Sequence, residues 1–185
     1  MRMASLVTHA FTAVALGKAL TVWKLPPRFW ALAVVSAILP DADAVGFAFG
    51  IQYGDLLGHR GLSHSLAFAV AWSCSVMALV DFPNIARGSR TWWKLIALLS
   101  AVTASHGVLD ALTKGGLGVE FFSPFDGTRY FFPWRPLVVS PISFDEFFTG
   151  WGATVLWNEM KFVWLPLAVI WLGVTVAQQV LRRPD

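Results

Sequence analysis

The stretch FWALAVVSAILPDADAVGFAFGI, residues 29–51, sets the fold class of this chain. It is apolar over the length of a membrane crossing, which needs about 20 residues, yet it carries Asp41 and Asp43 directly after Pro40. Each charged Asp at mid-helix depth costs roughly 2.5–3.5 kcal/mol on insertion scales, and this is tolerated where a partner, a cation or a water-filled cavity compensates. The stretch predicts a membrane helix whose aspartates have a functional role.

The composition of the whole chain agrees with a membrane protein. Of its 185 residues, 56% are hydrophobic and 14% are charged, whereas soluble domains carry about 25% charged residues. The length favours one integral membrane domain, residues 1–185. The net charge is +3, but Lys and Arg fall between the apolar stretches, not on one amphipathic face, so we expect no nucleic-acid partner. A lone cysteine, Cys74, allows no intrachain disulfide and is expected to be a packing residue.

The apolar stretches predict an all-α fold, a polytopic transmembrane bundle of about five helices. They cover residues 4–23, 29–51, 62–82, 92–113 and 160–181. The first stretch is longer than the apolar region of a signal peptide and contains a histidine, so we expect it to stay in the protein as a helix. Residues 114–159 are rich in Phe, Tyr and Trp. They predict an aromatic interfacial segment between the fourth and fifth helices.

The positive charges predict the orientation of these five helices. With five crossings, eight cations share one side of the membrane: Lys18, Lys24, Arg28, Arg87, Arg90, Lys94, Arg182 and Arg183. The six others share the opposite side: Arg2, Arg60, Lys114, Arg129, Arg135 and Lys161. The eight lie in short connections and at helix ends, where the positive-inside rule counts most, so we place their side in the cytoplasm.

This topology brings the candidate metal ligands together near the extracytoplasmic face. These are all the histidines and three of the aspartates: His9, Asp41, Asp43, His59, His64, His106 and Asp110. His106 and Asp110 are four residues apart, so on a helix they share one face and can hold the same cation. His59 and His64 belong to the glycine-bearing turn GHRGLSHS, residues 58–65, which can bring both rings to one centre.

Less specific explanations exist for each residue alone. A single histidine in a helix is often a hydrogen-bonded packing residue, and this alternative stays open for His9. Asp41 and Asp43 are two apart, which points them in nearly opposite directions on an unbroken α-helix, and Pro-Asp-x-Asp can simply end a helix. Pro40 can distort that turn so that both carboxylates point inward. Convergence of all these groups at one end favours a metal site.

Several motifs, in this order, give the chain a family resemblance. They are the early His9, the Leu39-Pro40-Asp41-x-Asp43 segment, the His59-Arg60-Gly61-x-Ser63-His64-Ser65 turn, Ser105-His106-x3-Asp110, Phe122-Ser123-Pro124-Phe125 and Arg129-Tyr130-Phe131-Phe132-Pro133. The chain resembles the YdjM-like family of LexA-regulated, membrane-bound, predicted metal-dependent hydrolases. This resemblance implies a multi-pass protein of a prokaryotic inner (cytoplasmic) membrane, with phospholipid-like substrates.

A hydrolytic mechanism is consistent with the residues themselves. His and Asp ligands without thiolate suit Zn²⁺, Mn²⁺ or Fe²⁺, and we favour Zn²⁺ or Mn²⁺. Seven ligands are enough for two ions, bridged by Asp41 or Asp43 and able to activate a water molecule. One of these two acids is the expected general base. Arg60, Arg129 and Arg135 are expected to bind phosphate oxygens of the substrate, with Arg60 catalytic.

The position of the site points to membrane lipids as partners, and to a lipid or lipid-linked phosphoester or ester as the substrate. Two other classes of function stay open. A metal or proton transporter would use the same His and Asp residues, but its polar residues should continue toward the cytoplasm, where only Asp81 and Lys18 interrupt apolar sequence. A structural metal that stabilises the bundle would have closed coordination, whereas a catalytic metal keeps an open position.

Overall fold

The computed structural model describes residues 2–21, 25–141, 144–148 and 150–181. Seven α-helices stand in it: α1 Leu6–Leu20, α2 Pro27–Ile38, α3 Leu66–Leu79, α4 Arg90–Ala111, α5 Phe144–Phe147, α6 Gly150–Glu159 and α7 Leu165–Leu181. Helical turns of other pitch form η1 Leu39–Phe49, η2 Leu62–His64 and η3 Met160–Trp164. The predicted all-α class is confirmed; a two-residue pair, β1 Arg2–Met3 with β2 Ser140–Pro141, is the one small sheet among the described residues.

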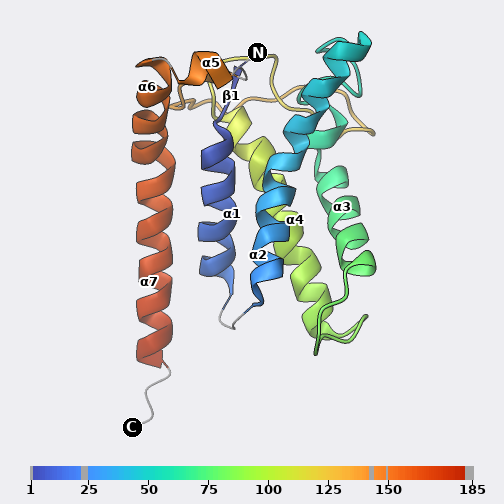
Figure 1. Cartoon of the computed structure of the whole chain (residues 1–185), viewed down its shortest axis with the longest axis vertical. Coiled ribbons are helices and arrows are strands. Elements are labelled where there is room, and N and C mark those ends of the chain that lie inside the picture. The colour runs from blue at the N-terminus through green and yellow to red at the C-terminus, as the bar shows by residue number, and fades with distance from the viewer. Residues whose placement is uncertain (1, 22–24, 142–143, 149, 182–185) are drawn as a thin grey trace.

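The bundle is arranged around α4, which packs against α1, α2 and α3. Small residues such as Ala13, Ala33 and Ala37 are fully buried and let the helices approach closely. Larger side chains, among them Phe29 and Leu99, fill the core between them. The connections after η1 and after α4 lie at the end of the bundle where the chain begins, and the C-terminal end of α7 lies at the other end (Figure 1).

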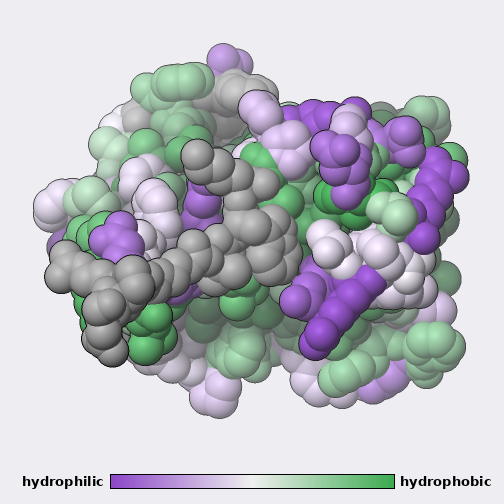
Figure 2. Space-filling view, turned by 90° about the horizontal axis from the view of Figure 1, so that it is seen from below, coloured by the Kyte–Doolittle hydropathy of each residue, from purple (hydrophilic) through white to green (hydrophobic). Residues whose placement is uncertain are grey.

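Three helical segments are long and apolar enough to cross a membrane: Pro27–Phe49, Arg90–Ala111 and Gly150–Leu181. The helices Leu6–Leu20 and Leu66–Leu79 are apolar but shorter, with 15 and 14 residues. Hydrophilic residues gather on part of the bundle end that lies away from the N terminus, as Figure 2 shows. The cations Lys24, Arg182 and Arg183, like residues 22–23 of the first predicted helix, lie outside the described residues.

The last helix differs from the prediction. It was expected over residues 160–181 but begins at Gly150, because α6, η3 and α7 form one continuous helical segment. Its first ten residues, α6, belong to the predicted interfacial segment 114–159, so that segment and the last predicted helix join without a break. Glu159, where α6 ends, is fully buried and accepts a hydrogen bond from Thr8 of α1. The π-helical turn η3 ends two residues before Pro166, which has no N–H to donate.

Candidate metal centre

Four side chains from three parts of the chain face one another at the end of the bundle near the N terminus. Their atoms form one group: Asp41 Oδ1, His64 Nε2, His106 Nε2 and Asp110 Oδ2. The two imidazole nitrogens are 3.0 Å apart. Asp41 Oδ1 lies 3.3 Å from His106 and 3.7 Å from His64. Asp110 Oδ2 lies 3.6 Å from His64 and 3.9 Å from His106.

These separations are those of ligands around a metal ion. Zinc binds imidazole nitrogen and carboxylate oxygen at about 2.0–2.2 Å, which places neighbouring ligand atoms of a tetrahedron roughly 3.3–3.6 Å apart. Most of the observed separations are too long for a hydrogen bond. The side chains are buried, at 0% exposure for both histidines and Asp110 and 6% for Asp41. The group therefore has the spacing and burial of a ligand set for one cation.

Unpaired polar atoms support the same fit. Neither carboxylate oxygen of Asp41 has a hydrogen-bond partner among the described residues, although the residue is buried. A buried carboxylate without a partner is strongly unfavourable. The His64 ring has carboxylate oxygens of Asp41, Asp43 and Asp110 within 3.7 Å of its two nitrogens. The centre therefore favours a positive charge, which a proton or a metal ion supplies.

Hydrogen bonds on the far side of each ring fix which nitrogen faces the centre. His106 Nδ1 lies 2.7 Å from the backbone oxygen of Ala37, which can only accept, so Nδ1 carries the proton and Nε2 is free to bind a metal. His64 Nδ1 lies 2.9 Å from Ser63 Oγ and 3.1 Å from Asp43 Oδ2. Metal-binding histidines are typically oriented in this way by an outer hydrogen bond.

Asp43 lies in this outer layer. Its Oδ1 is 2.7 Å from His59 Nδ1, and its Oδ2 accepts hydrogen bonds from Ser63 Oγ at 2.6 Å and from the backbone N–H of Arg60 at 3.2 Å. Asp43, His59 and His64 also form a second group with the spacing of metal ligands. His59 Nε2 is buried without a hydrogen-bond partner among the described residues. The structure thus places the two aspartates differently: Asp41 in the central group, Asp43 against the histidine turn.

The local backbone explains how Asp41 and Asp43 reach the same side. At Leu39 the α-helix tightens into the 3₁₀-helix η1, with Pro40 in its first turn. Side chains two residues apart, such as those of Asp41 and Asp43, are separated by about 160° around an α-helix but by about 120° around a 3₁₀-helix. The irregular turn expected at Pro40 is present. An 11-residue 3₁₀ segment is unusually long, and such segments often mark functional positions.

Arg60 is a buried part of this assembly. It has a positive φ of 64° and is fully buried. Its Nε lies 3.0 Å from Asp110 Oδ2, Nη1 donates to the Gly115 carbonyl at 2.8 Å, and Nη2 donates to Thr113 Oγ1 at 3.2 Å. These contacts direct the guanidinium toward Asp110 and the segment after α4. They give Arg60 a positioning role, and its predicted contact with substrate stays a prediction.

The other two arginines lie outside the central group. Arg129 donates to the backbone oxygens of His59 and Tyr53 at 3.1 and 3.0 Å and pairs with Glu120 at 2.7 Å, so it holds the histidine turn. Arg135 is exposed and stacks on Phe131. Burial raises the pKa of the Tyr53 phenol, which keeps this neighbour of His59 neutral. The structure does not bring the three arginines together as one phosphate-binding set.

His9 lies beside the central group. Its ring stacks on His106 with centroids 3.8 Å apart, and its Nε2 is 3.8 Å from Asp110 Oδ1. Neither ring nitrogen has a hydrogen-bond partner among the described residues. His9 does not belong to either group with metal-ligand spacing. Its role as a packing residue and its role as an additional ligand both remain compatible with this position.

Sequence reasoning missed two contributors. Ser63 bonds to both Asp43 and His64, although its place inside the histidine turn was visible. Glu159 accepts hydrogen bonds from Ser5 and Thr8 at the start of α1. The N–H of the residue before Ser5, Ala4, donates to Asp110 Oδ1 at 2.9 Å. The signal for Glu159 was an acidic residue inside an apolar helical run, which by default indicates function.

Comparison with known proteins agrees with this set of motifs. The sequence model of the family described as YdjM inner membrane protein matches residues 3–183. The chain belongs to the YdjM family. The chain is also 35% identical over 169 residues to the inner membrane protein YbcI of Escherichia coli (strain K12), and the aligned region covers 89% of this chain and 92% of that protein. No solved structure matches the chain. The chain is therefore a membrane protein of this family, and the predicted family is confirmed.

Proposed function

We propose that this protein is a metal-dependent hydrolase that cleaves an ester or phosphoester bond of a membrane lipid or a lipid-linked molecule. The observation that supports it is the group of Asp41, His64, His106 and Asp110, whose atoms have the separations of metal ligands inside a membrane bundle. Ionisable residues at this depth are expensive to bury, so they point to function.

The donor set fits a divalent cation such as Zn²⁺ or Mn²⁺, because it contains two imidazoles and two carboxylates and no thiolate. A bound cation would supply Lewis acidity and lower the pKa of a water molecule toward neutrality. The second group, Asp43 with His59 and His64, would hold a second cation if two are needed.

The residues of the chain have separable tasks in this proposal. Asp41 Oδ2 has no hydrogen-bond partner among the described residues, so it is the atom that would take a proton from an attacking water. Asp110 is held from two sides, by Arg60 at Oδ2 and by the Ala4 N–H at Oδ1. It would therefore bind the cation and would not transfer a proton. Asp43 orients the two histidines of the turn.

A structural metal is the second candidate, because all four donors are almost completely buried. Four protein ligands with no open position are typical of structural zinc sites. The transporter alternative is weaker, since the core between the site and the far end of the bundle is filled by apolar side chains such as Phe29, Met77, Leu95 and Leu99. We place the site near the extracytoplasmic face, following the distribution of Lys and Arg.

Hydrolysis by metal-loaded protein tests the proposal. Detergent-purified protein is loaded with Zn²⁺ or Mn²⁺ and assayed on phospholipids and on p-nitrophenyl phosphate and carboxylate esters, beside His64→Ala and Asp41→Ala. Asp55→Ala is the matched control, because Asp55 is exposed in the preceding loop. Turnover that is lost in the two site variants and kept in the control supports the enzyme. Stoichiometric metal without turnover on any substrate supports the structural site instead.

A further inference from the structure

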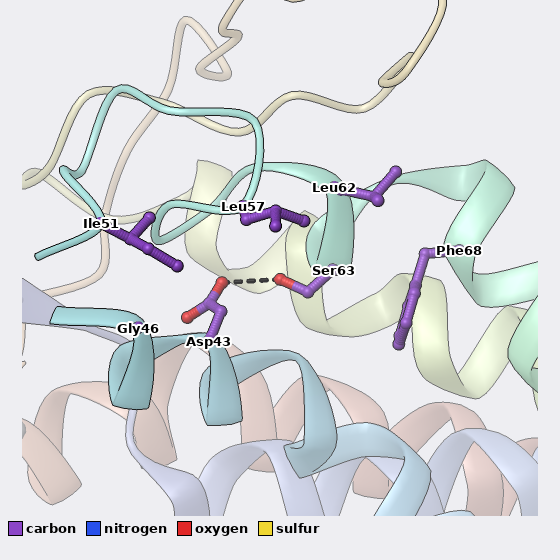
Figure 3. A pocket seen from close by; sticks show the side chains of 7 residues that line it. All are labelled: Asp43, Gly46, Ile51, Leu57, Leu62, Ser63 and Phe68. Carbon is purple, nitrogen blue, oxygen red and sulfur yellow. Dashed lines mark hydrogen bonds between the residues drawn. The ribbon is translucent and has the colours of Figure 1, made fainter. Parts of the chain in front are cut away.

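A pocket of about 260 Å³ lies directly against the histidine turn. Its wall contains four apolar side chains, Ile51, Leu57, Leu62 and Phe68, which come from the loop after η1, from η2 and from α3. Asp43 and Ser63 form its polar end, joined by a hydrogen bond of 2.6 Å (Figure 3). The pocket is therefore apolar over nearly all of its surface, and Asp43 and Ser63 lie at the end that faces the candidate metal centre.

The polar end is continuous with that centre. Asp43 Oδ2 lies 3.1 Å from His64 Nδ1, and the Nε2 of the same ring faces Asp41, His106 and Asp110. A molecule with an apolar part in the pocket would therefore place its polar part beside His64.

The surroundings indicate what kind of molecule this is. Large apolar side chains are exposed in the same segments of the chain that line the pocket, including Val45, Phe49 and Leu56. Phe49 ends one of the helical segments that are apolar enough to cross a membrane. In a membrane protein, exposed apolar surface of this kind is covered by lipid chains and not by water. An apolar pocket next to such a surface suits an aliphatic chain better than a water-soluble ligand.

We propose that this pocket binds an aliphatic chain of a membrane lipid whose polar head lies at Asp43 and Ser63. This names the recognition element for the substrate and rests on the proposed function. A volume of about 260 Å³ accommodates part of an aliphatic chain. Each buried methylene changes binding by roughly fourfold, so the pocket selects chain length.

The first test uses binding without catalysis. Protein in nanodiscs of phosphatidylethanolamine and phosphatidylglycerol is photolabelled with a phosphatidylglycerol that carries a diazirine in its acyl chain. Leu57→Trp narrows the pocket from its exposed side, and Leu79→Trp, an exposed position near the C-terminal end of α3, is the matched control. We expect strong label on residues 51–68, most of it lost in Leu57→Trp and retained in Leu79→Trp. Equal label in all three proteins, or none in this segment, would overturn the proposal, whether the pocket is empty or covered by another protein chain.

The second test separates this proposal from the hydrolase proposal. Hydrolysis rates are measured for a series of lipid esters of increasing chain length and for p-nitrophenyl acetate. We expect kcat/KM to rise by roughly fourfold per methylene until the pocket is filled, and to stop rising at shorter chains in Leu57→Trp than in the wild type, with p-nitrophenyl acetate as the short-chain reference in both proteins. Activity that ignores chain length in both proteins contradicts the pocket alone. Absence of all hydrolysis with label still confined to residues 51–68 contradicts the hydrolase alone.

Discussion

Replacing Asp43 by asparagine is expected to weaken metal binding by roughly 10–100-fold without abolishing it. The carboxylate contacts four donors: His59 Nδ1, His64 Nδ1, Ser63 Oγ and the Arg60 N–H. Asparagine keeps one oxygen acceptor and turns the other into an NH₂ donor, which would face hydrogen-bond donors. The His64 ring then loses part of the restraint that aims Nε2 at the central group.

The size of this effect follows from the position of Asp43 outside the central group. Loss of an outer hydrogen bond to a metal-binding histidine typically lowers affinity 10–100-fold, which corresponds to about 1.4–2.8 kcal/mol. Removal of a direct ligand from the central group would instead leave only three of its four donors. The prediction therefore distinguishes an orienting carboxylate from a coordinating one.

The assay is a competition titration of metal-free protein with Zn²⁺ and Mn²⁺ against a chelator of known affinity, in detergent. Asp55→Asn is the control, because Asp55 Oδ2 accepts a hydrogen bond from the Gln52 N–H in the same loop but lies outside the site. Unchanged affinity in Asp43→Asn would show that the orienting contacts do not matter. Loss of one whole equivalent of metal would make Asp43 a direct ligand of a second ion.

Three further predictions concern stability. Chelation of a bound metal should lower the unfolding temperature, measured by thermal unfolding in detergent. Adding the metal back at about 100 times its dissociation constant should restore about 2.7 kcal/mol of unfolding free energy. An unfolding temperature of metal-loaded protein that the chelator does not change would contradict this. Arg60→Met should destabilise the fold by about 3–5 kcal/mol, because it leaves buried Asp110 without its ion-pair partner, whereas Arg87→Met at an exposed ion pair should change stability by less than about 1 kcal/mol; equal effects would be inconsistent with the buried pair. Glu159→Ala should destabilise the fold by about 1–3 kcal/mol because the Ser5 and Thr8 donors lose their acceptor, measured by thermal unfolding beside Gln179→Ala at an exposed position of α7; equal stability of the two variants would show that these hydrogen bonds do not hold the start of α1.

The fold class followed from hydropathy, because apolar runs of membrane length have few alternatives in lipid. Helix boundaries were harder to predict where polar residues have a buried partner. Glu159 lies at the predicted boundary between the interfacial segment and the last helix, and its contacts with Ser5 and Thr8 bury it inside a continuous helical segment. The change from α2 to η1 was foreseeable as a distortion at Pro40, but the length of the 3₁₀ segment was not, since it depends on packing against the histidine turn.

The residues of the candidate site could be predicted from the sequence, but not which of them belong to the central group and which contact that group from outside. Spacing placed His106 and Asp110 on one helix face, and the structure has both in the central group. Nothing in the spacing of Asp41 and Asp43 says which one lies in the centre and which one contacts the outer side of the histidines. Arg60 was expected to reach a substrate because arginine often binds phosphate, whereas its contacts in the structure are with Asp110, Thr113 and Gly115. Such choices depend on tertiary contacts between segments far apart in the chain.

The most direct measurement is the metal content of purified, correctly folded protein by mass spectrometry, comparing wild type with His106→Ala and with Asp55→Ala. After loading with Zn²⁺ or Mn²⁺ and removal of free ions, we predict at least one equivalent of metal in wild type and in Asp55→Ala. In His106→Ala, with folding checked by circular dichroism, that equivalent should be lost, because one of the four central donors is gone. Wild-type protein that stays folded and metal-free after loading, or His106→Ala that retains the full equivalent, would show that this group is not a metal centre.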